Sequence, residues 1–286
     1  MNTIKILSWN VEHFKMNKTV EVAEIIKSYD PDVFGIYEVE AKEIYAFMLD
    51  YFPGYSIFIT EGQQIQEILV ACRNTMEAIK FQQKKEFQSG NLSLRPGAFL
   101  TFQYPNKGLY NFLFLHTDSG NGPVDFGNRT EMFEHAYNLK RKLDFDNNRQ
   151  PVNFVMLGDF NTMGLEYPRP YKSDKIAQTW TELSYLDFYA NKRSGSNEYK
   201  SLIPKLRRLN KPTGTYYSST LGISDLDHII VSDHLRCQPQ TNYFKSGSFE
   251  VKLDGWIKYK KDKVKLNKFI TEISDHCLLY CELIVP

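Results

Sequence analysis

The sequence is short of the features that mark membrane, secreted and multidomain proteins. No apolar run is long enough to span a bilayer, and the first residues lead into an expected strand with no signal peptide before it. No linker, low-complexity tract or repeat marks a domain boundary in the 286 residues. We therefore expect one domain over residues 1–286 and a cytoplasmic location, unless a signal peptide has been removed.

Strong net charge and a cysteine framework are also missing. The 35 basic and 34 acidic residues leave a formal charge of +1, so no overall field attracts a polyanion, and nucleic acid would need a local basic patch. The four cysteines, Cys72, Cys237, Cys277 and Cys281, have no zinc-site spacing, which favours free buried thiols. No feature points to an obligate protein partner.

What the chain has in quantity is apolar sequence in short runs. Hydrophobic residues make up 42% of it, including 20 Phe and 18 Tyr, which is enough for a large core. These runs and the polar turns between them predict strands at 4–9, 32–37, 55–60, 67–73, 78–83, 98–104, 110–115, 152–158, 226–232 and 277–285. Helices are expected at 19–29, 41–51, 129–143 and near 173–183. Runs of strands punctuated by helices predict an α/β fold of two sheets packed face to face with helices outside.

One expected strand ends in an unusual group of residues. The valine-rich run 152–157 is followed by Gly158, which permits a tight turn, and then by Asp159 and Asn161. Residues two apart in extended chain point to the same side, so these two side chains would project together. A carboxylate beside a carboxamide suits a metal-bound phosphate and an attacking water. An Asx turn that only ends the strand is the alternative interpretation.

Matching polar residues lie at the ends of other expected strands. They are Asn10, Glu38, His116, Asp227, Asp275 and His276. Hard oxygen ligands such as Glu38, Asp275 and Asn10 suit Mg²⁺ or Mn²⁺. An imidazole at His276, held in one tautomer by a carboxylate such as Asp227, could move a proton near neutral pH. These parts describe metal-assisted hydrolysis at phosphorus.

Six short segments carry a family resemblance. They are ILSWNVE (6–12), GIYEV (35–39), FLHT (114–117), LGDFNT (157–162), DLDHI (225–229) and ISDH (273–276). In this order they resemble the motifs of the endonuclease/exonuclease/phosphatase superfamily, which includes deoxyribonuclease I, abasic-site exonucleases, inositol polyphosphate 5-phosphatases and neutral sphingomyelinases. The resemblance covers nearly the whole chain. It implies a four-layer α/β sandwich with two mainly antiparallel sheets inside.

The resemblance also implies roles for the polar residues. It places Mg²⁺ at Glu38, with Asn10 and Asp275 nearby, and it makes Asp159 the residue that positions or activates water. Asn161 would bind the scissile phosphate. His276, oriented by Asp227, would act at the reacting phosphate as a base or as a transition-state stabiliser. Whether Asp159 or His276 is the general base stays open.

Three further residues resemble the deoxyribonuclease branch of the superfamily. His116 matches a histidine that contacts phosphate or protonates the leaving group, and Glu67 stands where that branch has the glutamate that orients it. Arg95 resembles a phosphate-binding arginine. For Glu67 and Arg95 a surface salt bridge is the competing interpretation.

The leading functional hypothesis is a Mg²⁺-dependent enzyme that cleaves phosphodiester bonds in DNA or RNA. The basic segment 192–211 and the pair Tyr216–Tyr217 could track a backbone and stack bases, although a solvated basic loop is the simpler interpretation of that segment. The alternative is a phosphatase or phosphodiesterase for inositol phosphates, phospholipids or small nucleotides. A catalytically inactive binding module is a remote third hypothesis, because every catalytic position keeps its residue type.

Overall fold

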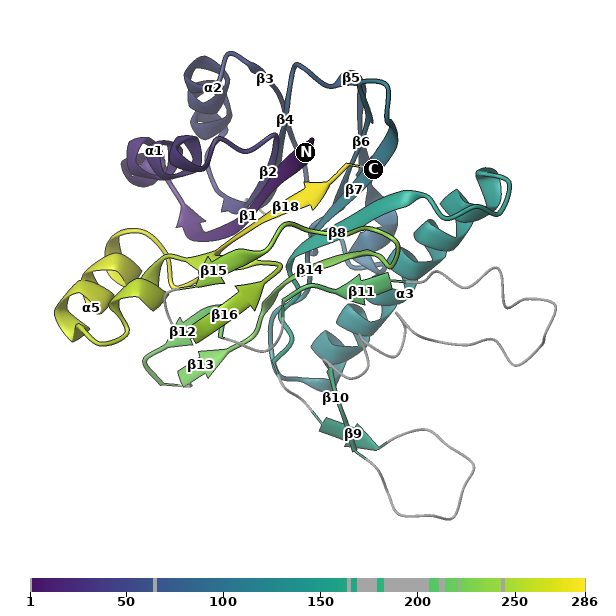
Figure 1. Cartoon of the computed structure of the whole chain (residues 1–286). Coiled ribbons are helices and arrows are strands. Elements are labelled where there is room, and N and C mark those ends of the chain that lie inside the picture. The colour runs from purple at the N-terminus through teal and green to yellow at the C-terminus, as the bar shows by residue number, and fades with distance from the viewer. Residues whose placement is uncertain are drawn as a thin grey trace.

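Two six-stranded sheets make up most of the part of the chain that the structure describes (Figure 1). This computed structural model describes residues 2–63, 66–163, 166–168, 179–182, 206–210, 214–220, 222–242 and 245–285. Sheet A has the order β17 (Lys252–Asp254), β18 (Leu278–Ile284), β1 (Thr3–Phe14), β2 (Val33–Val39), β4 (Glu67–Arg73) and β3 (Tyr55–Ile59). Sheet B has the order β11 (Leu206–Arg208), β14 (Asp227–Ser232), β8 (Asn153–Asp159), β7 (Gly108–His116), β6 (Gly97–Tyr104) and β5 (Glu77–Lys84).

Both sheets are mixed, and each has a single parallel pair at its centre. In sheet A the parallel pair is β1 and β2, and in sheet B it is β7 and β8. The other neighbours in each sheet are antiparallel. The expectation of two mainly antiparallel sheets is confirmed.

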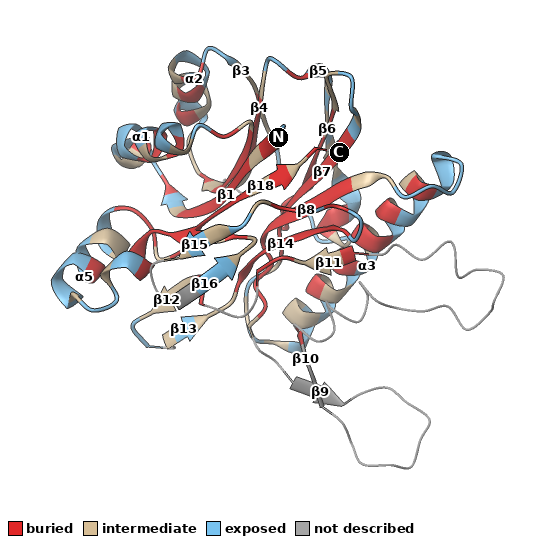
Figure 2. Cartoon of the chain, in the orientation of Figure 1, coloured by how far each residue is buried: buried red, intermediate tan, exposed pale blue. Residues whose placement is uncertain are grey.

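Three clusters of buried apolar residues hold the sheets and helices together. Figure 2 shows that the strands of the two main sheets are largely buried. Alternate residues of both sheets form the central layer between them. Helices α1 (Thr19–Tyr29) and α2 (Lys42–Tyr51) pack on the outer face of sheet A. Helix α3 (Pro123–Asp146) packs on the outer face of sheet B. The order helix, sheet, sheet, helix is the four-layer sandwich that the sequence predicted.

Smaller elements lie around this sandwich. Three short antiparallel pairs are β9 (Glu166–Pro168) with β10 (Thr179–Thr181), β12 (Tyr216–Ser218) with β13 (Gly222–Ser224), and β15 (Gln240–Asn242) with β16 (Lys245–Phe249). Helix α5 (Lys263–Glu272) and short 3₁₀ helices at Met16–Lys18, Lys85–Gln88 and Trp256–Tyr259 complete the described elements. In these residues no helix is long and apolar enough to cross a membrane.

Two helix predictions need correction. Helix α3 begins at Pro123, six residues before the expected start at 129, because proline is favoured in the first helical turn and the Asp125 carboxylate accepts a hydrogen bond from the Gly122 amide at 2.9 Å. The helix expected near 173–183 is wrong at Thr179–Thr181, which form β10 instead, and 173–178 and 183 lie outside the described residues. Of the basic segment 192–211, the structure describes only 206–210.

Candidate active site

Strand alternation turns four of the polar residues into the space between the sheets. On β1, Ile4 and Ile6 belong to the central core layer, and Asn10 shares their parity. On β8, Val155 and Leu157 precede Asp159 in the same way. His116 on β7 and Asp227 on β14 also share the parity of strand residues in that layer. A period of two residues therefore brings these side chains to one side of each sheet.

Sheet topology then brings them to one end of the sandwich. His116 pairs in register with Asp159 at the carboxyl end of the parallel pair, and Asp227 pairs with Asp159 at the start of the next, antiparallel strand. In sheet A, β18 runs antiparallel to β1, so the residues just before it, Asp275 and His276, lie near the end of β1. Parallel strands end together and their antiparallel neighbours begin there.

Glu38 reaches the same place through a local break in the strand. Phe34, Ile36 and Val39 all pack in the outer layer, so the alternation fails at Glu38, whose φ is 63°. Its Oε2 atom accepts hydrogen bonds from the His13 amide at 3.0 Å and from Gln66 Nε2 at 3.1 Å. Non-glycine residues with positive φ are held by their surroundings and gather at functional sites.

Gly158 lies within β8, paired with Leu115 and His228, and does not form the tight turn expected from the sequence, yet this position still needs glycine. Gly158 has a φ of 143°, and a Cβ atom there would lie 1.9 Å from the Leu115 carbonyl oxygen. Any side chain would push β7 and β8 apart just before His116 and Asp159.

His276 and Asp227 form a close contact between the two halves of the sandwich at this end. His276 Nδ1 lies 2.8 Å from Asp227 Oδ2, and both side chains are buried. The backbone of His276 is also fixed, because its amide donates to Ser274 Oγ at 2.9 Å and its carbonyl accepts from Trp9 Nε1 at 3.3 Å. Burial alone would lower the pKa of His276, but the carboxylates of Asp227 and Asp159 outweigh it and raise the pKa to about 10. The imidazole is therefore a cation at neutral pH.

Asp159 is buried beside this cation and is tied to its neighbours. Its Oδ2 atom accepts from Asn10 Nδ2 at 2.8 Å and lies 3.8 Å from His276 Nε2. Its Oδ1 atom accepts from the Asn161 amide at 3.0 Å. Burial raises the pKa of Asp159 to about 7, while the nearby His276 works in the opposite direction. The side chain of Asn161 is held by the Thr117 carbonyl oxygen, 3.1 Å from Nδ2.

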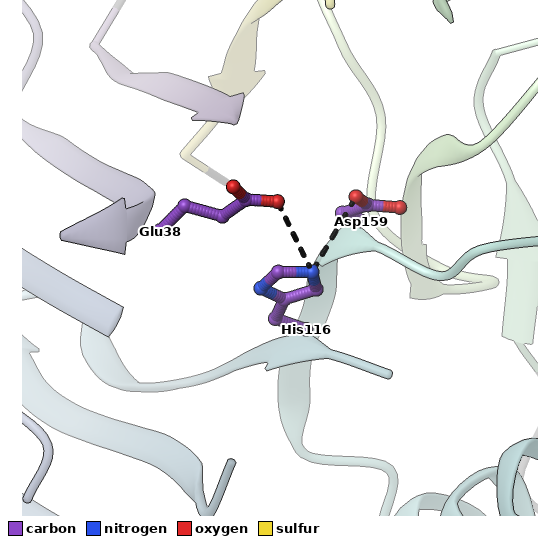
Figure 3. Close-up of side chains that lie close together, drawn as sticks. All are labelled: Glu38, His116 and Asp159. Atoms are coloured by element: carbon purple, nitrogen blue, oxygen red, sulfur yellow. Dashed lines mark ion pairs between the residues drawn. The ribbon is translucent and has the colours of Figure 1, made fainter. Parts of the chain in front are cut away.

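His116 sits between the two carboxylates shown in Figure 3. Its Nε2 atom lies 3.8 Å from Glu38 Oε1 and 3.7 Å from Asp159 Oδ2. Its other ring nitrogen, Nδ1, is buried and has no hydrogen-bond partner within the described part of the chain. Burial lowers the pKa of His116 well below its usual value, with smaller contributions from the charges of Arg95 and His276. A neutral ring with its proton on Nε2, facing the carboxylates, fits this environment.

Arg95 joins the site through a residue that the sequence did not single out. The guanidinium Nη2 of Arg95 donates to Gln66 Oε1, and Gln66 in turn donates to Glu38. Arg95 is buried, which lowers its pKa against the opposing charges of Glu38 and Asp159. Gln66 was missed because the chain around it carries no motif.

The structure does not bring Glu67 to His116. The Glu67 carboxylate accepts from Thr60 Oγ1 at 2.5 Å and from the Gly62 amide at 2.7 Å. It makes no hydrogen bond to His116 among the residues that are described. The orienting role expected of Glu67 therefore has no contact to support it, and the carboxylate instead fixes the turn before β4.

These residues match a known family along almost the whole chain. A sequence model described as the Endonuclease/Exonuclease/phosphatase family aligns with residues 7–276, which include all of the polar positions above. The chain belongs to this family. Its members are phosphoric ester hydrolases that depend on divalent metal ions. No curated protein sequence matches the chain closely enough to count as a relative.

Solved structures of similar fold include enzymes with different substrates. TDP2 from C. elegans shares 14% identity, with a TM-score of 0.64, over 99% of this chain and 75% of that one. TDP2 from D. rerio, complexed with a single-strand DNA product, shares 12% identity, with a TM-score of 0.62, over 99% of this chain and 100% of that one. A mannosyl-6-phosphatase from Bacteroides thetaiotaomicron shares 13% identity, with a TM-score of 0.56, over 98% of this chain and 99% of that one. At these identities the likeness shows the fold.

The carboxylates at this end of the sandwich are suited to binding a divalent cation. Glu38, His116 and Asp159 present ligand atoms within 4.8 Å of one another. Asp275 Oδ1 is buried with no hydrogen-bond partner in the described structure, and burial, together with Glu12 and Glu38, raises the pKa of Asp275 to about 6 against the effect of His276. Carboxylates kept close together with an unused oxygen are the donors that Mg²⁺ or Mn²⁺ takes.

Asn10 faces this acidic group with its amide nitrogen. Its Nδ2 atom donates to Glu38 Oε1 at 3.1 Å as well as to Asp159, while its Oδ1 atom accepts from the Glu12 amide at 2.9 Å. In this arrangement Asn10 presents no free oxygen to a cation between Glu38 and Asp159. It links the two carboxylates and fixes their separation.

Proposed function

We propose that this protein is a Mg²⁺-dependent phosphoesterase that hydrolyses phosphodiester bonds, with DNA or RNA as its substrate class, and that residues 1–286 act as one domain. Family membership supports phosphoric ester hydrolysis. The observation that carries the proposal is the buried His276–Asp227 pair next to the high-pKa carboxyl of Asp159. Such a pairing of cation and base is what hydrolysis by water at phosphorus requires.

Glu38 and Asp275 are the residues that would hold the metal, with Mn²⁺ as a possible substitute. When bound there, the metal neutralises charge on the phosphate. Asn10 holds the Glu38 and Asp159 carboxylates apart by donating to both. Arg95, through Gln66, adds a positive charge on the side of Glu38 away from Asn10 and is available to bind a phosphate oxygen.

Asp159 is the general base of the proposed reaction. Burial raises its pKa above that of an ordinary aspartate, which makes the carboxylate a better acceptor for a proton from water. The imidazole of His276, with a pKa of about 10, is already protonated and cannot take that proton. His276 instead donates from Nε2 to the phosphate and stabilises its growing negative charge, and Asp227 keeps the ring oriented.

His116 and Asn161 complete the phosphate site. His116 is kept neutral by burial and can donate a hydrogen bond from Nε2 to the phosphate or the leaving oxygen. Asn161 is fixed by Thr117, which leaves its second amide hydrogen for a phosphate oxygen.

The second candidate is a phosphatase or phosphodiesterase acting on a small phosphate ester. Inositol phosphates, phospholipids and small nucleotides are the classes to consider. The likeness to a mannosyl-6-phosphatase over 98% of the chain favours this candidate, whereas the likeness to a TDP2 with bound DNA product favours the first. Both use the same catalytic residues and differ only in what binds around them.

A plasmid assay separates the two candidates. Supercoiled DNA is incubated with the protein, with and without Mg²⁺, beside the variants His276→Ala and His135→Ala. His135 lies on α3 against the Phe87 ring, so its variant controls for loss of a histidine outside the site. We expect Mg²⁺-dependent nicking by wild type and His135→Ala but not by His276→Ala. Folded wild-type protein that binds Mg²⁺ without nicking DNA would reject DNA as the substrate, and RNA, a phosphodiester and a phosphomonoester of p-nitrophenol are then assayed; activity on none of the nucleic acids would reject the nuclease.

A further inference from the structure

Thr215 lies between two loops, the one that leads into Asp227 at the start of β14 and the one before β18 that holds His276. It precedes β12 and is fully buried. No strand of either main sheet contains it. The segment around it runs alongside both loops, because Gly214 donates to Asp225 Oδ1 at 2.7 Å and Tyr217 donates to the Asp275 carbonyl oxygen at 3.0 Å.

The contacts of Thr215 reach both members of the pair. Its Oγ1 atom accepts the backbone amides of Leu226 and Asp227, each at 2.9 Å. Its carbonyl oxygen accepts the amide of Cys277, the residue after His276, at 2.6 Å. One residue thus fixes the backbone at Asp227 and immediately beside His276.

We propose that Thr215 is a positioning residue that sets the distance between Asp227 Oδ2 and His276 Nδ1. Asp227 belongs to sheet B and His276 precedes a strand of sheet A, so backbone pairing within one sheet does not fix their separation. Side chains packed between two sheets permit small sliding movements, whereas hydrogen bonds to both backbones do not. Thr215 supplies that connection at the catalytic end of the sandwich.

The residue type explains why threonine stands there. A hydroxyl oxygen has two lone pairs and can accept both amides, while the carbonyl contact needs no particular side chain. Valine has the same shape but no acceptor, so it would leave two buried amides unpaired. Serine keeps the acceptor and loses only a methyl group. Cysteine offers a sulfur that accepts weakly.

The test measures both geometry and catalysis in the full-length protein. Nuclear magnetic resonance detects the proton shared by His276 Nδ1 and Asp227 as a low-field signal, assigned by its loss in His276→Ala. For Thr215→Val we expect this signal to move upfield or to exchange away. Steady-state kinetics on the substrate found above should show kcat lowered by about 10- to 100-fold with KM little changed, since a displacement near 1 Å costs about that much.

Matched variants separate positioning from general loss of structure. Ser232 lies at the far end of β14, where its buried Oγ accepts the Phe154 amide at 3.2 Å and donates to the Val152 carbonyl oxygen at 2.8 Å. Ser232→Ala therefore removes a similar buried hydroxyl, and we expect it to keep the signal and kcat. Thr215→Ser should keep the wild-type resonance and kcat, because serine retains the hydroxyl. Thr215→Cys should give a resonance and a kcat between those of Thr215→Ser and Thr215→Val.

Three outcomes would overturn the proposal. The first is a wild-type signal and kcat in Thr215→Val, and the second is an equal loss in Ser232→Ala. If Thr215→Val does not fold, Thr215→Ser and Thr215→Cys are compared instead. The third outcome against the proposal is that these two variants have the same resonance and the same kcat. Only the kcat measurement of this proposal rests on the function proposed above. A wild-type protein that hydrolyses no phosphate ester would reject that function while the resonance still tests Thr215.

Discussion

The two sheets follow one plan and deliver different chemistry. Each has a central parallel pair joined through a helix, β1 to β2 through α1 and β7 to β8 through α3. Each pair has two antiparallel strands on either side: β18 and β17, then β4 and β3, in sheet A, and β14 and β11, then β6 and β5, in sheet B. The halves therefore present strand ends at equivalent places, and those ends meet at one end of the sandwich.

Equivalent places hold unlike residues. By chain order β1 corresponds to β7 and β2 corresponds to β8, so Asn10 stands where His116 does, and Glu38 stands where Asp159 does. The sheet A half supplies Glu38 and Asp275, which are proposed to hold the metal. The sheet B half supplies the proposed base, Asp159, which also lies in the cluster of Glu38, His116 and Asp159. The same backbone plan thus serves either purpose, and the residue at the strand end decides which. The pair of His276 and Asp227 is where the halves join.

The largest effect should come from removing the base in the sheet B half. For Asp159→Asn we expect kcat to fall by about 10²- to 10⁴-fold, because proton transfer from water loses its acceptor. The Mg²⁺ concentration at half-maximal activity should stay near the wild-type value. Kinetics over a Mg²⁺ series measure both, and exposed Asp146→Asn on α3 is the control. A large shift in the Mg²⁺ concentration required would contradict the assignment of Asp159 as a base that does not bind the metal.

The pH dependence of activity should report on the His276–Asp227 pair, where the two halves meet. The Asp227 carboxylate is the main influence that raises the pKa of His276 to about 10, while burial opposes it. In Asp227→Asn the pKa of His276 should fall, so the imidazolium is lost at lower pH. We expect the alkaline limb of kcat/KM, near pH 10 in wild type, to move to lower pH, with kcat lowered by about 100-fold or more. The Asp227 carboxylate also raises the pKa of Asp159, so the acid limb from Asp159 should move to lower pH as well. An unmoved alkaline limb would contradict the assignment of His276.

The sheet A half should respond through metal affinity. In Glu38→Gln the metal loses a charged ligand, and we expect the affinity for Mg²⁺ or Mn²⁺ to weaken by about 10- to 100-fold, since even a partner of a ligand is worth that much. Calorimetric titration checks this without any substrate. Glu43→Gln, an exposed change on α2, should bind as wild type does. Unchanged affinity in Glu38→Gln would remove Glu38 from the metal site.

Sequence patterns predicted the parts of this site that depend on local rules. Asp159 and His116 were predicted as strand-end residues, and strand alternation is the local rule that turns them to the inner face. Glu38 was named as a strand-end residue, yet its inward direction depends on a positive φ that no periodic pattern shows. The beginning of α3 was predicted too late, because the first turn is polar and the proline and the capping aspartate in it were not recognised as a helix start.

Contacts between distant residues were beyond such patterns. Arg129, fully buried on α3, bonds to Glu182, which is 53 residues away in the chain, and to the carbonyl oxygens of Asp118 and Gly120. It thereby shapes the loop after His116. Glu67 is the reverse case: its position in the sequence suggested a contact with His116 that the structure does not show. Its carboxylate instead accepts a hydrogen bond from the hydroxyl of Thr60, which is nearer in the chain. Short-range partners win when they cost less chain ordering.

The smallest effect should come from Gln66, and it is the most discriminating. Gln66 bridges Arg95, which precedes β6 of sheet B, and Glu38 of sheet A. Gln66→Leu removes both hydrogen bonds without adding charge, and we expect metal affinity or activity to fall by about tenfold, the lower end of the range for residues that support a ligand. If the bridge mainly orients Glu38, calorimetry will show weaker metal binding. If it mainly aims Arg95, KM for substrate will rise while metal affinity holds. Exposed Gln82→Leu on β5 is the control, and a variant equal to it in both measurements would show that the bridge serves neither half.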